Sequence, residues 1–297
     1  MTILHHVSLL TASADQTTAF YTGVLGLRLI KNTVNQENVH MRHLFYGDNL
    51  GTPGSVVTFF EVPHLGHRYN DGSYLDHIGL RIPTGTAAFW QQRLVAHQCP
   101  ATLENNMVTL TDPNDVTIQL IETDQTLTAE AVVDNEIPGA NQITGLFSAD
   151  VVAADVNATQ TFFSVMLDET VDATVPLVAG QLNIVPAEND GVHRFGRGSM
   201  DHLAVSVDAD SDLLTLATRA KQHGYTVEEM ADRGWFKSLY VLEPNGSRIE
   251  FATMSPGFSL DEPLETMGQQ LGLPPRFEPQ RQEILNYFKT KGVDFHD

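Results

Sequence analysis

Two histidines and one glutamate in this sequence have the types and positions to bind a divalent metal ion. His6 and His202 each lie near the start of a short apolar run, and Glu250 lies in the middle of another. If these runs are strands of one curved sheet, their side chains meet on its concave face. Two imidazoles and one carboxylate on one side of a metal leave positions for water and substrate, which is the ligand set of non-haem Fe(II) oxygenases.

Alternation within the first strand separates its two neighbouring histidines. The side chains of a regular strand point alternately to its two faces. His6 is therefore expected on the same face as Leu4 and Ser8, and His5 on the opposite face. This pattern favours His6 as the ligand and gives His5 only a supporting role at the edge of the site.

Internal repeats are the elements that must position these residues. The same kind of strand begins four times, each time followed by a helix-like run, and such self-similarity indicates a repeat architecture. Aligning the copies on one position predicts a fourfold duplication of a small unit. The four starts are Leu4-His5-His6-Val7, Leu75-Asp76-His77-Ile78, Ile143-Thr144-Gly145-Leu146 and Met200-Asp201-His202-Leu203, aligned on His6, His77, Gly145 and His202.

Each unit is predicted to contain a strand, a helix and three further strands. In the first unit Ser13 can cap the helix and Gly26 can end it. The strand-like runs of this unit occupy residues 3–10, 27–30, 43–46 and 56–62. The order predicts an α+β fold of four βαβββ modules. The length predicts two domains of two modules each, residues 1–138 and residues 139–297, the second with a C-terminal tail.

The closing strands of the repeats carry different polar residues at one equivalent position. In the second and fourth repeats the residue six positions after a proline lies in mid-strand, and these residues are Gln119 and Glu250. The corresponding residues are Thr58 in the first repeat and Asn183 in the third. Only the fourth repeat offers a carboxylate there. His77 competes less well as a ligand, because its own repeat ends in an amide.

The overall charge argues against nucleic acids and membranes as partners. The 297 residues include 37 acidic and 17 basic side chains, and the formal net charge of −20 repels phosphate backbones and anionic lipid surfaces. A single cysteine, Cys99, rules out an internal disulfide framework. The sequence begins without the pattern of a signal peptide, and no apolar stretch reaches the ~18 to 20 residues of a membrane span. We expect a soluble, cytoplasmic protein.

Two other pairs of histidines lack the features of a metal site. His64 and His67 share a predicted loop, and His40 and His43 flank a predicted strand. Neither pair has a carboxylate at a convincing position. Surface or packing roles are expected for all four residues.

The segment FYTGVLGLRLIK, residues 20–31, resembles the vicinal oxygen chelate superfamily, which is built from βαβββ modules and includes glyoxalases and extradiol ring-cleaving dioxygenases. The resemblance implies the glyoxalase/bleomycin resistance/dihydroxybiphenyl dioxygenase fold. Further segments are similar to the hydroquinone-type ring-cleaving dioxygenases over nearly the whole chain. These segments are HLFYGDNLGTPGSVVTFF at 43–60, DRGWFKSLYVLEPNGSRIEFAT at 232–253 and PGFSLDEPLETMGQQLGLPP at 256–275.

The resemblance also implies which residues form the site. The metal ligands of the similar family fall on His6, His202 and Glu250. Modules one and four are expected to pair around the metal, while modules two and three pair with each other. The active-site arginine and tyrosine of the family fall on Arg233 and Tyr240, which would offset negative charge and donate a hydrogen bond.

Two further positions follow from the same resemblance. Ser8 stands where the family has a small hydroxyl residue. Asp201 stands where close relatives have a second histidine before the fourth-module ligand. This difference leaves the three ligands intact, but it bears on proton transfer and on substrate preference.

The function expected from these features is an Fe(II)-dependent dioxygenase that cleaves a hydroquinone or catechol-like ring with O2, with Mn(II) as a possible replacement for iron. One alternative is a glyoxalase-type lyase or isomerase that uses a metal as a Lewis acid without O2. Another is a metal-free protein that binds an aromatic compound such as an antibiotic or a quinone. The resemblance also suggests a dimer or a larger homo-oligomer.

Overall fold

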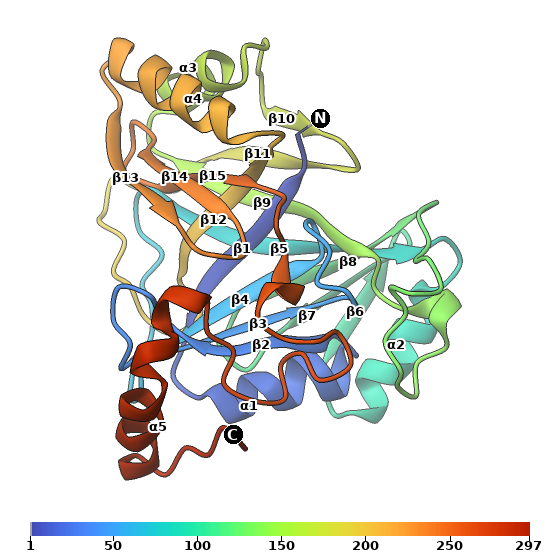
Figure 1. The fold of residues 1–297 in the computed structure, drawn as a ribbon. Helices are drawn as coiled ribbons and strands as arrows, with labels where there is room; N and C mark the ends of the chain where they lie inside the picture. Colours follow the sequence, from blue (N-terminus) through green and yellow to red (C-terminus); the bar gives the residue numbers. More distant parts are fainter. Residues whose placement is uncertain (1) are drawn as a thin grey trace.

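Four repeats of a strand, a helix and further strands build the protein, as the sequence predicts (Figure 1). The structure is a computed structural model and describes residues 2–297. The first repeat contains β1 (Leu4–Thr11), α1 (Ala14–Thr18) with a π-helical turn (Ala19–Val24), β2 (Arg28–Val34), β3 (Arg42–Gly47) and β4 (Val56–Glu61). The second contains β5 (Tyr74–Pro83), α2 (Ala87–Ala96), β6 (Ala101–Glu104), β7 (Met107–Thr111) and β8 (Thr117–Thr123).

The third repeat has one strand fewer than the predicted module. It contains β9 (Gly145–Ala153), α3 (Val156–Leu167), β10 (Thr174–Leu177) and β11 (Gly180–Pro186), after a short 3-10 helix (Gly139–Asn141). The fourth repeat is complete, with β12 (Met200–Val207), α4 (Asp210–Gln222), β13 (Thr226–Asp232), β14 (Lys237–Leu242) and β15 (Arg248–Thr253). The predicted α+β class is confirmed.

The strands form two mixed sheets, each made from two repeats. The first and fourth repeats form an eight-stranded sheet in the order β13-β14-β15-β12-β1-β4-β3-β2. The second and third form a seven-stranded sheet in the order β10-β11-β9-β5-β8-β7-β6. In both sheets the first strands of the two repeats pair antiparallel at the centre, and each lies parallel to the last strand of its own repeat. The division of the chain after residue 138 stays a prediction.

The strand register corrects one of the equivalences expected between repeats. At the centre of the eight-stranded sheet Ser8 pairs with His202, and at the centre of the seven-stranded sheet Gly79 pairs with Ser148. Ser148, and not Gly145, is therefore the third-repeat counterpart of His202. The sequence alignment failed here because Gly145 and its neighbours share only their apolar character with the other strand starts.

A β-bulge in β1 changes which side chains share a face. Leu4 pairs with Val205 and His6 with Ala204, so His5 is an extra residue opposite no partner. As a result Leu4 packs in the main core with Val7, whereas His6 points to the other face. The expectation that Leu4 and His6 share a face was wrong, because strict alternation holds only where the ladder is regular.

The segment after β15 closes over the eight-stranded sheet. It contains two 3-10 helices (Phe258–Leu260 and Pro275–Gln280) and α5 (Arg281–Thr290). The fully buried Lys31 of β2 forms ion pairs with Asp261, at 2.7 Å, and with Glu262. The indole Nε1 of Trp235 donates to the same Asp261 carboxylate at 2.7 Å. These bonds join the C-terminal segment to the wall of the cavity described below.

Local signals at the helices also agree with the sequence. The Ser13 hydroxyl accepts a hydrogen bond from the backbone N–H of Gln16 at the start of α1, as predicted. Asp155 caps α3 in the same way through the N–H of Ala158. None of the helices in residues 2–297 has the length and hydropathy needed to span a membrane.

Candidate metal centre and its cavity

Three neighbouring strands bring the predicted ligands together. His6 of β1 and Glu250 of β15 both pair with Ala204 of β12, one from each side. His202 lies two residues before Ala204 on the same strand and therefore on the same face. Because directly opposite residues point to the same side of a sheet, the three side chains converge above the small side chain of Ala204.

The donor atoms of these side chains form a nearly equilateral triangle. Nε2 of His6 lies 3.3 Å from Nε2 of His202. Oε2 of Glu250 lies 3.2 Å from the first nitrogen and 3.1 Å from the second. All three residues are buried, and no other group in the described part of the chain has three potential ligand atoms this close.

A second layer of contacts fixes the orientation of each ligand. Nδ1 of His202 lies 2.7 Å from the Asp201 carboxylate, and Nδ1 of His6 lies 2.8 Å from Nδ1 of His5. The Ser238 hydroxyl donates to Oε1 of Glu250 at 2.5 Å. These contacts leave Nε2 of both ligand histidines and Oε2 of Glu250 for a common partner. Metal-binding histidines commonly have such a carboxylate on the ring nitrogen away from the metal.

The electrostatics of the triangle fit a bound cation. Oε2 of Glu250 is fully buried and has no hydrogen-bond partner among residues 2–297. Burial alone would lower the pKa of His202, but the carboxylates of Asp201 and Glu250 outweigh it and raise that pKa to about 9. Burial disfavours the charged form of Glu250 too, yet the two imidazoles hold its pKa well below the usual value. A divalent ion would satisfy the orphaned oxygen, so the residues fit a metal.

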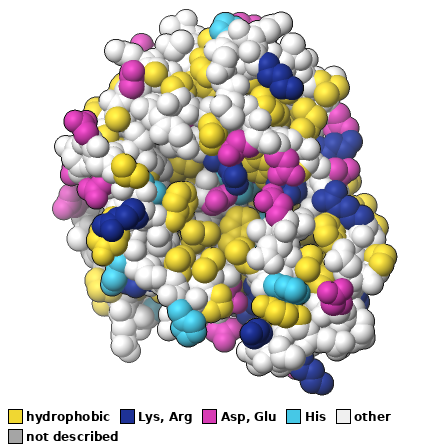
Figure 2. Space-filling view, turned by 90° about the vertical axis from the view of Figure 1, so that its left-hand side faces the viewer, with side chains coloured by type: hydrophobic (Ala, Val, Ile, Leu, Met, Phe, Trp, Pro, Cys, Tyr) yellow, Lys and Arg dark blue, Asp and Glu magenta, His cyan; other side chains and the backbone are white. Residues whose placement is uncertain are grey.

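A cavity of about 190 Å³ opens above His6 and His202, which are part of its lining. Its wall is largely aromatic, and charged side chains border it. On the face that includes β13, basic and acidic side chains gather around a hollow with an apolar floor (Figure 2). The aromatic residues of the wall are Phe45, Phe60, Trp235, Phe236 and Tyr240, and the charged ones are Glu37, Asp201, Arg233 and Arg248.

The three residues predicted to assist catalysis all line this cavity. Ser8 follows His6 on the same face of β1 and shares a 2.7 Å hydrogen bond with the Thr58 hydroxyl. Tyr240 pairs with Glu250 across β14 and β15, and its ring centroid lies 5.4 Å from that of His202. Their catalytic roles stay predictions.

Arg233 lies at the border of the cavity and not on its floor. Its guanidinium lies 5.1 Å from the centroid of the Tyr240 ring. It also forms ion pairs with Glu37, at 2.9 Å, and with Glu229, at 3.1 Å. Arg233 is therefore already balanced by two carboxylates.

Sequence reasoning missed two residues of the site. Ala204 supplies the space for the ligands, and no sequence motif marks a buried alanine as special. His43 packs against Phe45 and Phe60, as expected, but it also lines the cavity, which the sequence did not indicate. The sequence signal that could have indicated this is its spacing of two residues from Phe45, because residues two apart in a strand point to the same face. His77, the competing ligand, lies in the other sheet, outside the triangle.

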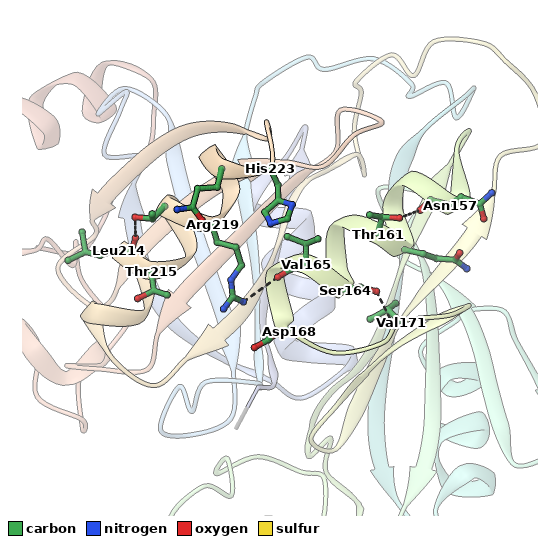
Figure 3. A pocket seen from close by; sticks show the side chains of 13 residues that line it. Asn157, Thr161, Ser164, Val165, Asp168, Val171, Leu214, Thr215, Arg219 and His223 are labelled. Atoms are coloured by element: carbon green, nitrogen blue, oxygen red, sulfur yellow. Dashed lines mark hydrogen bonds between the residues drawn. The ribbon is translucent and has the colours of Figure 1, made fainter.

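A larger groove lies elsewhere, between α3 and α4 (Figure 3). Its volume is about 1020 Å³, and mostly polar side chains of the two helices line it. Arg219, its only basic residue besides His223, donates to the backbone carbonyls of Val165 and Met166 at the end of α3. The groove contains no cluster of metal ligands, so the small cavity above His6 and His202 is the candidate site.

Comparisons with known proteins agree with this geometry. A family model described as "Glyoxalase/Bleomycin resistance protein/Dioxygenase superfamily" matches residues 3–120 and 144–251. The chain is 31% identical to MhqO of Bacillus subtilis (strain 168), provisionally named a ring-cleaving dioxygenase, over 98% of both chains. It is 26% identical to the chlorohydroquinone/hydroquinone 1,2-dioxygenase of Sphingobium indicum, over 95% of this chain and 94% of the other.

A solved structure extends the comparison to the fold. A crystal structure from Bacillus subtilis, described provisionally as a dioxygenase, superposes with a TM-score of 0.84. The two chains are 27% identical, and the match covers 96% of each. The likeness therefore includes both sheets and the C-terminal segment.

Proposed function

The chain belongs to the glyoxalase/bleomycin resistance protein/dioxygenase superfamily, and on this premise we propose that it is an Fe(II)-dependent dioxygenase that cleaves a single hydroquinone-like ring. The observation that carries the proposal is the triangle of His6, His202 and Glu250 beneath an aromatic cavity. Similarity to a chlorohydroquinone/hydroquinone 1,2-dioxygenase supports the choice of substrate class. Cleavage is proposed next to a hydroxyl-bearing carbon.

His6, His202 and Glu250 would hold the metal. Iron(II), when bound, supplies the redox chemistry between an electron-rich ring and O2, and Mn(II) is the proposed substitute. The set of two imidazoles and one carboxylate is the one that such iron oxygenases use. The protein's own contribution is to orient the ring, exclude water and handle protons.

The size of the cavity suits a substrate with one ring. An apolar cavity of ~150 Å³ is large enough for benzene. The cavity of about 190 Å³ therefore has room for a single ring with small substituents. Phe45, Phe60 and Phe236 line it with flat apolar surface, against which an aromatic ring packs and from which it excludes water.

Tyr240 is proposed as the hydrogen-bond donor to the substrate. It is 5% exposed, and burial raises the pKa of its phenol, so the hydroxyl keeps its proton near neutral pH. The adjacent Arg233 keeps its positive charge and would offset the negative charge of a phenolate or of the carboxylate formed on ring opening. Ser8 would hold the substrate edge next to His6.

Oxygen consumption tests the proposal directly. Protein loaded anaerobically with Fe(II) is mixed with 2-methylhydroquinone, hydroquinone or catechol in buffer containing O2, beside a His202→Ala control. Uptake of O2 with a new absorbance of a ring-opened product, absent in the control, is the expected result. Stoichiometric iron without uptake on any of these substrates would contradict the proposal and favour a redox-neutral lyase. Failure to bind a divalent metal would favour an aromatic-binding protein.

A further inference from the structure

A row of hydrogen-bonded side chains joins two residues of the cavity wall, from β1 to β3. The Ser8 hydroxyl of β1 lies 2.7 Å from the Thr58 hydroxyl of β4, and these residues are direct partners in the sheet. The Thr58 hydroxyl lies 2.9 Å from Nε2 of His43 in β3. The row begins beside the ligands, because Ser8 also pairs with His202. It ends at an imidazole that the proposed mechanism does not use.

The surroundings of His43 hold its ring in place. The ring stacks on Phe60, with centroids 4.0 Å apart, and it lies 4.1 Å from the ring of Phe45. Nε2 is engaged with the Thr58 hydroxyl, so Nδ1 is the ring nitrogen that this contact does not use. His43 is part of the cavity wall, so a bound ligand would pair with this remaining nitrogen.

The charge state of His43 suits a hydrogen bond to a hydroxyl group. Burial, with help from His202 and His6, lowers the pKa of His43 well below its usual value. The ring is therefore neutral and has one N–H donor and one lone-pair acceptor. If the N–H group faces Thr58, the lone pair is at Nδ1, and if the lone pair faces Thr58, the N–H group is at Nδ1. A hydroxyl group can form a hydrogen bond with either.

His43 lies away from the ligand triangle along the sheet. The triangle lies above Ala204 of β12, and β1 and β4 separate that strand from β3. A six-membered ring with one oxygen at the metal can therefore direct the opposite oxygen toward His43. In a 1,2-dihydroxy ring both oxygens lie at the metal end, and none is left for His43.

We propose that His43 binds the substrate hydroxyl opposite the metal and makes the site selective for 1,4-dihydroxy over 1,2-dihydroxy rings. The inference rests on the proposed function, because it assumes that one substrate oxygen lies at the metal centre. His43 is then a specificity residue, anchored by Thr58, on the far side of the ring from His6 and His202.

Equilibrium binding without oxygen tests this role. Calorimetry on Fe(II)-loaded protein under anaerobic conditions gives the Kd values of hydroquinone, 4-methylphenol and catechol. One extra hydrogen bond predicts about tenfold tighter binding of hydroquinone than of 4-methylphenol to the unaltered protein. His43→Phe keeps a flat ring on Phe60 but has no nitrogen, so this ratio should fall to about 1 while the Kd of 4-methylphenol is retained.

The same substitution at His40 is the matched control. His40 lies outside the cavity wall and stacks on Tyr287, so His40→Phe should keep the preference for hydroquinone. Thr58→Val, which removes the anchor of Nε2, should weaken the preference by about threefold. His43→Gln, which can still pair with a hydroxyl, should restore part of what His43→Phe loses.

Two results would overturn the assignment. One is an unchanged preference for hydroquinone in His43→Phe, and the other is an equal loss of affinity for hydroquinone and 4-methylphenol, which would mean that His43 only packs the wall. Selective binding that depends on His43, in a protein that consumes no O2, would contradict the dioxygenase function and support the role of His43.

Discussion

The two sheets have the same arrangement at their centres, so their equivalent positions can be compared one by one. The position held by Ala204 in the eight-stranded sheet is held by Asp150 in the seven-stranded sheet. There Asp150 accepts a hydrogen bond of 2.7 Å from the Asn183 amide, which occupies the place of Glu250. One sheet therefore has a small side chain below a carboxylate that faces two imidazoles, and the other has a carboxylate–amide pair in the same place.

The bulges also differ between the sheets. In β1 the extra residue is His5, and His6 keeps its regular pairing with Ala204. In β5 two residues, His77 and Ile78, lie between the paired Asp76 and Gly79, and His77 has a left-handed backbone with φ of 61°. The repeated backbone therefore allows a metal site in either sheet. A few side chains and the position of one bulge determine whether the site forms.

Glu250→Gln should have the largest effect, because it replaces the carboxylate with an amide, the group that Asn183 supplies at the equivalent place in the other sheet. A neutral amide is a poor metal ligand, so iron content should fall to ~0.1 per chain or less and O2 uptake by at least ~100-fold. Metal analysis after dialysis and an oxygen electrode measure both. The reciprocal substitution in the seven-stranded sheet, Asn183→Glu, should not create a metal site. Metal binding by that variant would contradict the conclusion that the bulge at His77 prevents a site there.

Tyr240→Phe should lower kcat by about 100-fold and leave the iron content unchanged. The phenol is the donor to the substrate, and removing a proton donor commonly costs this much or more. Its counterpart in the seven-stranded sheet is Thr109, which pairs with Gln119. Steady-state O2 uptake provides the measurement, with Tyr225→Phe outside the cavity as the control. An unchanged kcat would remove Tyr240 from the proposed mechanism.

Asp201→Asn should weaken iron binding by about 10-fold to 100-fold. The carboxylate is 2.7 Å from Nδ1 of His202, and outer partners of metal-binding histidines have effects of this size. Competition with a chelator gives the affinity. The same substitution at Asp150, in the other sheet, should leave iron affinity as it is. Equal loss in both variants would indicate a general effect on folding.

The smallest effect is expected from substitutions in the turn that precedes the last strand of the second and fourth repeats. The Asp112 carboxylate accepts the backbone N–H groups of Asn114 and Val116, and Glu243 accepts those of Asn245 and Ser247. Asp112→Asn and Glu243→Gln should each lower the free energy of unfolding by about 1–2 kcal/mol, without loss of iron. Urea unfolding measures the change. Unequal losses would show that the turns are not equivalent.

The local pattern of the sequence predicted the repeated units and the meeting of His6, His202 and Glu250. Repeats are visible because apolar positions and turn residues recur in the same order. The prediction that Leu4 shares a face with His6 was wrong, because a bulge at His5 reverses the alternation of side chains. Nothing in the residues around His5 indicates a bulge. Ala204 and His43 were missed because their importance depends on which strands become neighbours.

The C-terminal segment was also beyond prediction as a structural element. Lys31 and Asp261 lie far apart in sequence, and a buried lysine is unusual unless acidic groups surround it. Such a pairing arises from the three-dimensional arrangement and has no periodic signal. It matters to the site because Asp261 also holds the Trp235 indole in the cavity wall.

The central place of β1 has a consequence for the synthesis of the chain. β1 lies between β4 and β12, and 196 residues separate His6 from His202. While the ribosome adds these residues, one edge of β1 has no partner, and unpaired edges with distant partners slow folding and promote aggregation. A chain that stops before residue 200 should therefore aggregate, and should not survive as a smaller, independent enzyme.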